Sequence, residues 1–154
     1  MTNIARRLDE LGIDLPVPAA PVANYIPFTV SRGIVHVSGQ VSSSPDGGIK
    51  GRVGEDLDVA AGQRAARLCG INLIAQFRAA CGGDLNRIAR VLKLGGFVQA
   101  GAGFGDIPRV VNGCSDLMVE LFGNHGRHAR SAVGVYCLPL GFAVEVDAVI
   151  ELRD

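Results

Sequence analysis

Two short segments near the C-terminus decide the fold: His128–Val135, which reads HARSAVGV, and Val144–Ala148, which reads VEVDA. The first contains a continuous apolar run. The second alternates valine and alanine with acidic residues, which is the two-residue period of a half-buried strand. The sequence therefore predicts two β-strands, at 132–137 and 143–152, joined by a short turn.

These two strands carry opposite charges. Arg130 stands at the start of the first strand, and Glu145 lies on the second. We expect the strands to be neighbours in one sheet, which would present a cation and a carboxylate close together. A guanidinium can hold a carboxylate through two parallel hydrogen bonds, and a second carboxylate can orient or activate water. The pair therefore favours a small anionic substrate that is held and hydrated.

Hydrophobic periodicity predicts the remaining elements. They are a short helix at 3–12, a β-hairpin with strands at 25–30 and 34–38, a long helix at 57–81, a strand at 88–99 and a second long helix at 107–122. After the short first helix, the order is ββαβαββ. The simplest α+β arrangement is one mixed sheet with both long helices on one face. The other face would then be covered by further subunits.

Composition narrows the class of protein. A chain of 154 residues with zero formal net charge and no basic run argues for one domain without a nucleic-acid partner. Its four cysteines form no Cys-x-x-Cys pair, so neither a structural disulfide nor a zinc site is expected. No run is apolar and long enough for a secretory signal or a membrane span, so we expect a cytoplasmic protein with no membrane partner.

Each candidate site residue also has an ordinary structural interpretation. Arg130 could be a surface arginine, and Glu145, which alternates with apolar neighbours, could simply face solvent. Tyr25 could fill the core with its hydroxyl exposed. Ser38 and Gly39 end a predicted strand, where a glycine would also let a backbone amide approach a ligand.

Asn112 and the histidines leave similar alternatives. Asn112 lies just off the apolar stripe of the second long helix and could cross-link an interface or be solvated. His125 and His128 are close together, but no carboxylate stands at ligand spacing to them. We therefore expect no metal.

Together these residues resemble the RidA/YjgF family, also called the L-PSP endoribonuclease family. The resemblance covers roughly residues 20–152. It rests on an ordered set of short motifs: Tyr25, Ser38-Gly39-Gln40, the helix from Ala65 to Gly82, Val111-Asn112, Arg130-Ser131-Ala132-Val133, Leu138-Pro139 and Val144–Ala148. The sequence departs from the best-known members at two positions, with Ala132 where many have cysteine and Gly134 where many have glutamate.

The resemblance implies a chorismate-mutase-like fold and a homotrimer in which three sheets face inward as a barrel. It also implies three sites between subunits that hydrolyse 2-aminoacrylate-type enamines and imines to 2-keto acids and ammonia, without a cofactor. Arg130 would bind the substrate carboxylate and Glu145 would position or activate water. Substrate contacts would come from Tyr25, Ser38, Gly39, Asn112 and Ala132.

Two alternatives remain open. The first is a non-catalytic trimer that binds small carboxylates or metabolites. The second is RNA cleavage or translation inhibition, against which the zero net charge and the few aromatic residues argue. Residues 1–19 are interpreted as an N-terminal extension before a single domain at 20–154.

Overall fold

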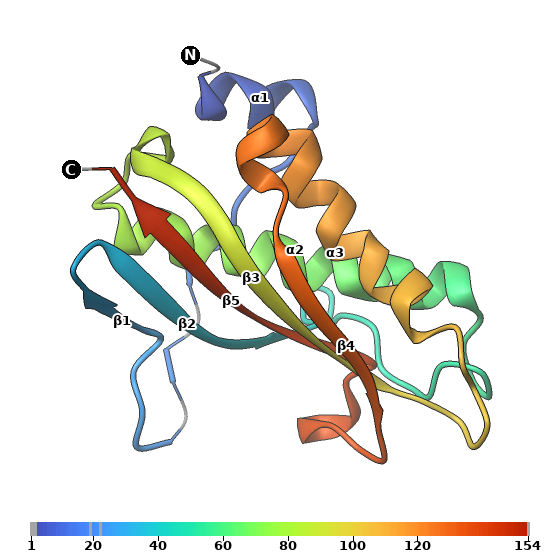
Figure 1. Ribbon diagram of the computed structural model, residues 1–154. Helices are drawn as coiled ribbons and strands as arrows, with labels where there is room; N and C mark the ends of the chain where they lie inside the picture. The colour runs from blue at the N-terminus through green and yellow to red at the C-terminus, as the bar shows by residue number, and fades with distance from the viewer. Residues whose placement is uncertain (1–2, 19, 22, 154) are drawn as a thin grey trace.

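The computed structural model describes residues 3–18, 20–21 and 23–153, and Figure 1 shows their arrangement. The helices are α1 (Ile4–Glu10), α2 (Val59–Ala80) and α3 (Ile107–Phe122), with short 3-10 turns at Leu85–Arg87, Gly123–Gly126 and Pro139–Gly141. The strands are β1 (Phe28–Ser31), β2 (Ile34–Val41), β3 (Ile88–Gln99), β4 (Ala129–Val135) and β5 (Val144–Leu152). The predicted α+β class and the order of elements are confirmed.

The five strands form one mixed sheet in the order β1-β2-β5-β3-β4. Only β3 and β4 pair in parallel, because α3 connects them as a crossover. The other neighbouring strands are antiparallel. The prediction that the Arg130 and Glu145 strands are neighbours is wrong, because β3 lies between β4 and β5 (Figure 1). The last two strands are therefore not a hairpin.

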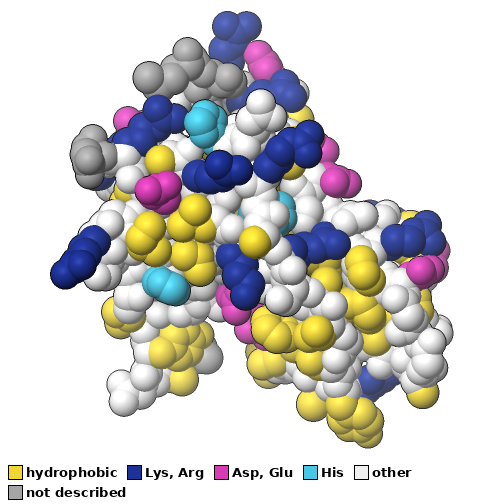
Figure 2. Space-filling model, in the orientation of Figure 1, with side chains coloured by type: hydrophobic (Ala, Val, Ile, Leu, Met, Phe, Trp, Pro, Cys, Tyr) yellow, Lys and Arg dark blue, Asp and Glu magenta, His cyan; other side chains and the backbone are white. Residues whose placement is uncertain are grey.

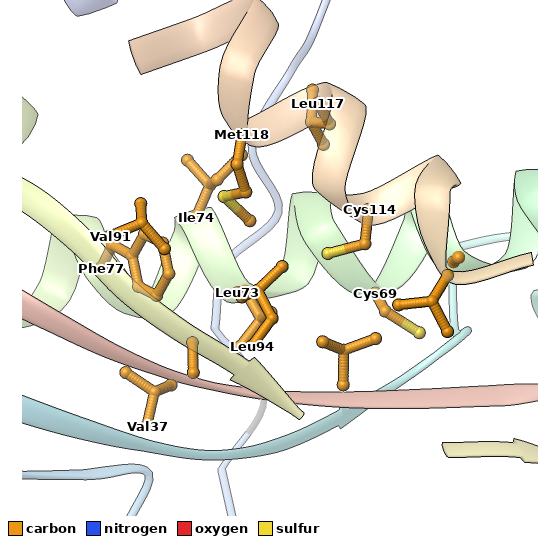
Figure 3. Packing of buried hydrophobic residues seen from close by; sticks show 14 of the residues in the cluster. Val37, Cys69, Leu73, Ile74, Phe77, Val91, Leu94, Cys114, Leu117 and Met118 are labelled. Carbon is orange, nitrogen blue, oxygen red and sulfur yellow. The ribbon is translucent and has the colours of Figure 1, made fainter. Parts of the chain in front are cut away.

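Both long helices pack on one face of the sheet, as predicted, and the core lies between the two layers (Figure 3). Fully buried Leu73 and Phe77 from α2 share this core with Leu117 from α3 and with Leu94 and Ile150 from the sheet. Helix α1 packs against the C-terminal part of the helical layer through buried Ile4 and Leu8. The alternating burial of β5 places Val144 and Val146 in this core.

The opposite face of the sheet is open (Figure 2). On β5 the residues that alternate with the core, including Glu145 and Asp147, are only half-buried. The register aligns Glu145 with Phe97 of β3 and then with Val133 of β4, which is 47% exposed. We call the surface formed by these four residues the open sheet face. Hydrophobic side chains gather over it, and no described element covers it.

Local chemistry explains where several elements begin and end. Helix α2 starts after Asp58, whose side chain accepts a hydrogen bond from the Ala61 N–H, and is thus shorter than predicted. Gly82 and Gly83 follow it with positive φ, as expected for a glycine C-cap. Strand β1 begins at Phe28 rather than at residue 25, because Pro27 has no N–H to donate.

Gly113 allows α2 and α3 to cross closely. A β-carbon at this position would overlap the backbone carbonyl oxygen of Gln63 on α2. Because backbone atoms cannot rotate aside, we expect Gly113→Ala to lower the free energy of unfolding by about 1–3 kcal/mol despite the better helix propensity of alanine. Denaturant unfolding measures the loss. Gly105→Ala is the matched control, since a β-carbon there meets nothing within 4 Å. Equal stability of the two variants would contradict the close crossing.

Candidate active site

Arg130 lies on the helix side of β4, against the first two turns of α3. Its Nη1 donates to Asn112 Oδ1 at 2.8 Å and to Ser115 Oγ at 3.1 Å, and its Nη2 donates to the Pro108 carbonyl at 3.3 Å. The three partners are three or four residues apart on one stripe of α3, so a single helix face fixes the guanidinium. Gly134, two positions beyond Ala132, would direct a β-carbon at Ile107 of α3, which confirms the side to which this part of β4 points.

The fixed guanidinium keeps two adjacent hydrogen-bond donors. A guanidinium has five N–H groups, and the three bonds to α3 leave one on Nε and one on Nη2. No carboxylate among the described residues forms an ion pair with Arg130. A cation with a free two-donor edge and no counter-charge is suited to bind a carboxylate bidentately.

His128 completes this arrangement. Its Nδ1 lies 2.6 Å from the Gly126 carbonyl oxygen and its Nε2 lies 2.9 Å from Ser115 Oγ. Since a carbonyl oxygen only accepts, Nδ1 carries the proton and Nε2 accepts from the Ser115 hydroxyl in the neutral ring. Burial lowers the pKa of His128, and the nearby Arg130 charge lowers it further, against the hydrogen bond to Gly126. The neutral ring thus orients Ser115, whose oxygen then accepts from Arg130.

Glu145 lies in a different place, in a cavity of about 430 Å³ at the end of β2. Tyr25, Gly39 and Gln76 line this cavity together with the turn residue Leu140 and with Phe142. Burial raises the pKa of Glu145 above its ordinary value, and the negative charge of Asp147 raises it further. Glu145 accepts no hydrogen bond from the part of the chain that the structure describes. A half-buried carboxylate with a raised pKa and a free acceptor edge is suited to take a proton from water.

Gly39 makes room for this carboxylate. It lies in a β-bulge, where the four residues of β2 from Val37 to Gln40 face three residues of β5, from Val146 to Ala148. A β-carbon on Gly39 would overlap Glu145 Oε1. Glycine at this position therefore leaves room for the close approach of the Glu145 side chain.

We expect Gly39→Ala to displace the Glu145 carboxylate. Because the displaced atoms are the end of a flexible side chain, the loss of stability should stay within about 1 kcal/mol. If Glu145 acts as a base, moving its carboxylate by about 1 Å should lower the catalytic rate by roughly 10- to 100-fold. Steady-state kinetics beside Gly105→Ala tests this expectation, and unchanged turnover of Gly39→Ala would contradict it.

The other sequence-predicted residues are divided between the two places. Tyr25 is 49% exposed and lines the Glu145 cavity, so its interpretation as a core residue is wrong. The Ser38 hydroxyl does not line that cavity; it donates to the Ile26 carbonyl at 2.8 Å and holds the segment that carries Tyr25. Asn112 binds Arg130, and Ala132 lies two residues further along β4 on the same side.

Arg130 and Glu145 cannot reach one small molecule within a protomer. Arg130 aligns with buried Leu94, whereas Glu145 aligns with Phe97, three residues further along β3. Strand spacing and rise put their Cα atoms about 14 Å apart. Their side chains also leave opposite faces of the sheet, one towards α3 and the other into the open sheet face. A site that uses both residues needs a second protomer.

Two polar side chains of the candidate site were not predicted from the sequence. Ser115 lies beside Arg130, and Gln76 lines the Glu145 cavity. Ser115 follows Asn112 by three residues on a predicted helix, a spacing that would have placed it on the same stripe. Gln76 carried no signal, because its position within α2 resembles that of any polar residue on a long amphipathic helix.

Among the described residues, no group of three or more His, Cys, Asp or Glu could hold a metal ion. Likewise, no helix in the described ranges has the length and hydropathy to cross a bilayer.

Residues 5–152 match the family described as "YjgF/chorismate mutase-like, putative endoribonuclease". The chain is 47% identical to Protein TCP17 of Trypanosoma cruzi, over 99% of this chain and 96% of that protein. It is also 47% identical in sequence to the protein Atu1372, of unknown function, from Agrobacterium tumefaciens. The crystal structure of that protein matches with a TM-score of 0.91 over 97% of this chain and 92% of the other. A "putative endoribonuclease" of Shewanella oneidensis MR-1 is 33% identical, with a TM-score of 0.94 over 98% of this chain and all of the other.

Proposed function

Since this chain belongs to the YjgF/chorismate mutase-like family, we propose that it hydrolyses 2-imino acids and their enamine tautomers to 2-keto acids and ammonia. The observation that carries the proposal is Arg130, a cation that forms no ion pair with the described residues and whose two donors left over from the bonds to α3 fit a carboxylate. The substrate class follows from what these groups can bind and from the family resemblance.

We propose that the active unit is a homotrimer with its sites between protomers. Arg130 of one protomer would face the Glu145 cavity of the next, which resolves their placement on opposite faces of one sheet. The open sheet face, with Phe97 and Val133 in its middle, is the surface that the other protomers would cover. This assembly would also exclude bulk solvent from the site and thereby strengthen its electrostatic interactions.

The reaction needs little more than placement and proton transfer, because a protonated imine is already electrophilic. Arg130 would hold the carboxylate and orient the imine carbon. Glu145 would take a proton from water as the water oxygen attacks that carbon, and the imine electron pair would move to nitrogen. Glu145 would then return the proton to nitrogen. The carbinolamine would collapse to the keto acid as Glu145, ionised again, takes the hydroxyl proton, the C–N bond breaks and ammonia leaves with that proton as ammonium.

An imine-capture assay tests this function. An amino-acid oxidase generates 2-iminopropanoate from alanine, and semicarbazide reports the imine that escapes hydrolysis. We expect catalytic amounts of the protein to lower semicarbazone formation, while heat-denatured protein does not. An unchanged rate in the presence of correctly folded protein would reject the proposal.

A non-catalytic carboxylate-binding role is the second candidate. The observation that favours it is that no described residue donates a hydrogen bond to orient Glu145, whereas Arg130 is fixed by three. Arg130-dependent binding of pyruvate without any effect on imines would establish this role. RNA cleavage, which the description of the family mentions, has less support, since the chain has zero net charge and no tryptophan.

A further inference from the structure

Gln76 is a buried side chain whose amide has no hydrogen-bond partner among the described residues. It lies on α2, is 2% exposed and lines the Glu145 cavity. Neither its oxygen nor its nitrogen forms a hydrogen bond within the described ranges. The other two buried polar side chains there are paired: Ser42 donates to the Ile49 carbonyl, and Gln99 donates to Gly51 and accepts from Leu138. Gln76 is thus the exception that needs an explanation.

The cavity provides that explanation. No fully enclosed side-chain nitrogen or oxygen of the described residues lacks a partner. The small accessible part of Gln76 therefore includes its amide, and the space that it meets is the cavity that it lines. A buried amide without a partner is costly, so whatever fills this cavity is expected to bond to it.

The surroundings define the chemistry of the occupant. The cavity wall also includes Val41, Leu140 and Phe142, which favour an apolar stem. The amide itself offers one acceptor and two donors. No lysine or arginine among the described residues of the same protomer lines the cavity, and Arg130 of the neighbouring protomer would be taken by the carboxylate at the reacting end. A negatively charged end would therefore be unpaired and close to Glu145, which is unfavourable in a half-buried site. A neutral polar end can form a hydrogen bond with the Gln76 amide and places no second negative charge near Glu145.

We propose that Gln76 determines specificity by hydrogen bonding to a neutral polar group at the end of the substrate side chain. The inference rests on the proposed function for the reacting end of the molecule, because it takes the carboxylate at Arg130 and the imine carbon at Glu145. The preferred substrates are 2-imino acids with an apolar stem and an amide-type terminus. Gln76 acts only on the side chain and takes no part in the chemical step.

Three side chains of nearly equal shape test this inference: those of glutamine, homoleucine and glutamate, which are neutral polar, apolar and anionic. Their imines are generated by an amino-acid oxidase, and kcat/KM is measured for the wild type and for Gln76→Met, a variant of similar volume. We expect the wild type to prefer the glutamine-derived imine over the homoleucine-derived one about tenfold. Gln76→Met should lose this preference and turn over the two imines with similar kcat/KM.

Two outcomes separate the failure of this inference from that of the proposed function. Normal turnover of 2-iminopropanoate with the same glutamine-to-homoleucine ratio in both proteins would overturn the role of Gln76 alone. If the wild type hydrolyses no imine, calorimetry with the stable amino acids glutamine and homoleucine still tests selection. Tighter binding of glutamine that is lost in Gln76→Met would support the inference, and equal binding of both by the wild type would overturn it.

Discussion

Replacing Arg130 by alanine is expected to lower kcat/KM for 2-iminopropanoate by about 30-fold or more. The variant loses both donors that would grip the substrate carboxylate. It also leaves Asn112 and Ser115 without the cation that they hold. Removing one partner of a buried charge-assisted pair costs about 2–5 kcal/mol, which corresponds to roughly 30- to 4000-fold. Imine capture by semicarbazide measures the effect for the wild type and the variant side by side.

The matched variant is Arg130→Lys, which keeps the positive charge but cannot offer two donors on adjacent nitrogens. We expect it to recover only part of the activity, mainly by a higher KM. Size-exclusion chromatography checks that both variants assemble like the wild type. Full activity of Arg130→Ala would show that Arg130 does not bind the substrate carboxylate, and would contradict the proposed function.

Replacing Glu145 by glutamine is expected to lower kcat roughly 100- to 10,000-fold, because the amide keeps the shape but cannot accept the proton from water. The wild type should lose activity as the pH falls through the pKa of Glu145, since only the ionised form is a base. Burial raises this pKa, so the loss should occur at higher pH than for an ordinary glutamate. The small residual rate of Glu145→Gln should not show this acid limb.

Asp147 provides a control on the same strand. It lies two residues from Glu145 on the open sheet face, and burial raises its pKa in the same way. Its charge contributes to the raised pKa of Glu145. Asp147→Asn should therefore remain active and shift the acid limb of the pH profile to lower pH. An Asp147→Asn variant as inactive as Glu145→Gln would show that the loss follows any lost carboxylate on this face.

Elements with a strong local pattern could be predicted from the sequence. The apolar stripe of α3 and the Val/Leu-rich run of β3 gave their bounds as observed, 107–122 and 88–99. Strand β4 was placed three residues too late, at 132 rather than 129. Residues 129–131 belong to it because they pair with Lys93, Leu94 and Gly95, which are distant in sequence. Arg130 is consequently inside a strand and not before it.

In the candidate site, too, features set by local sequence pattern could be predicted, whereas those set by contacts distant in sequence could not. The alternation of β5 correctly gave the side from which Glu145 projects. The sequence carried no information that β3 separates β4 from β5, since strand order depends on how α3 packs. The prediction of one cation–carboxylate pair in a single sheet failed for this reason. Gln76 could not be identified either, because its missing partner is visible only once the cavity is defined.

Mixing two inactive variants tests the central claim, a site shared between protomers, most directly. Arg130→Ala and Glu145→Gln are unfolded together in equal amounts, refolded and assayed for hydrolysis of 2-iminopropanoate. With random assembly about three quarters of the trimers would be mixed, and each mixed trimer would have one interface in three with an intact Arg130 and an intact Glu145, so about a quarter of all interfaces would be intact. We predict recovery of about a quarter of the wild-type activity, although each variant refolded alone stays inactive. No recovery from demonstrably mixed trimers would show that the two side chains do not act across the interface.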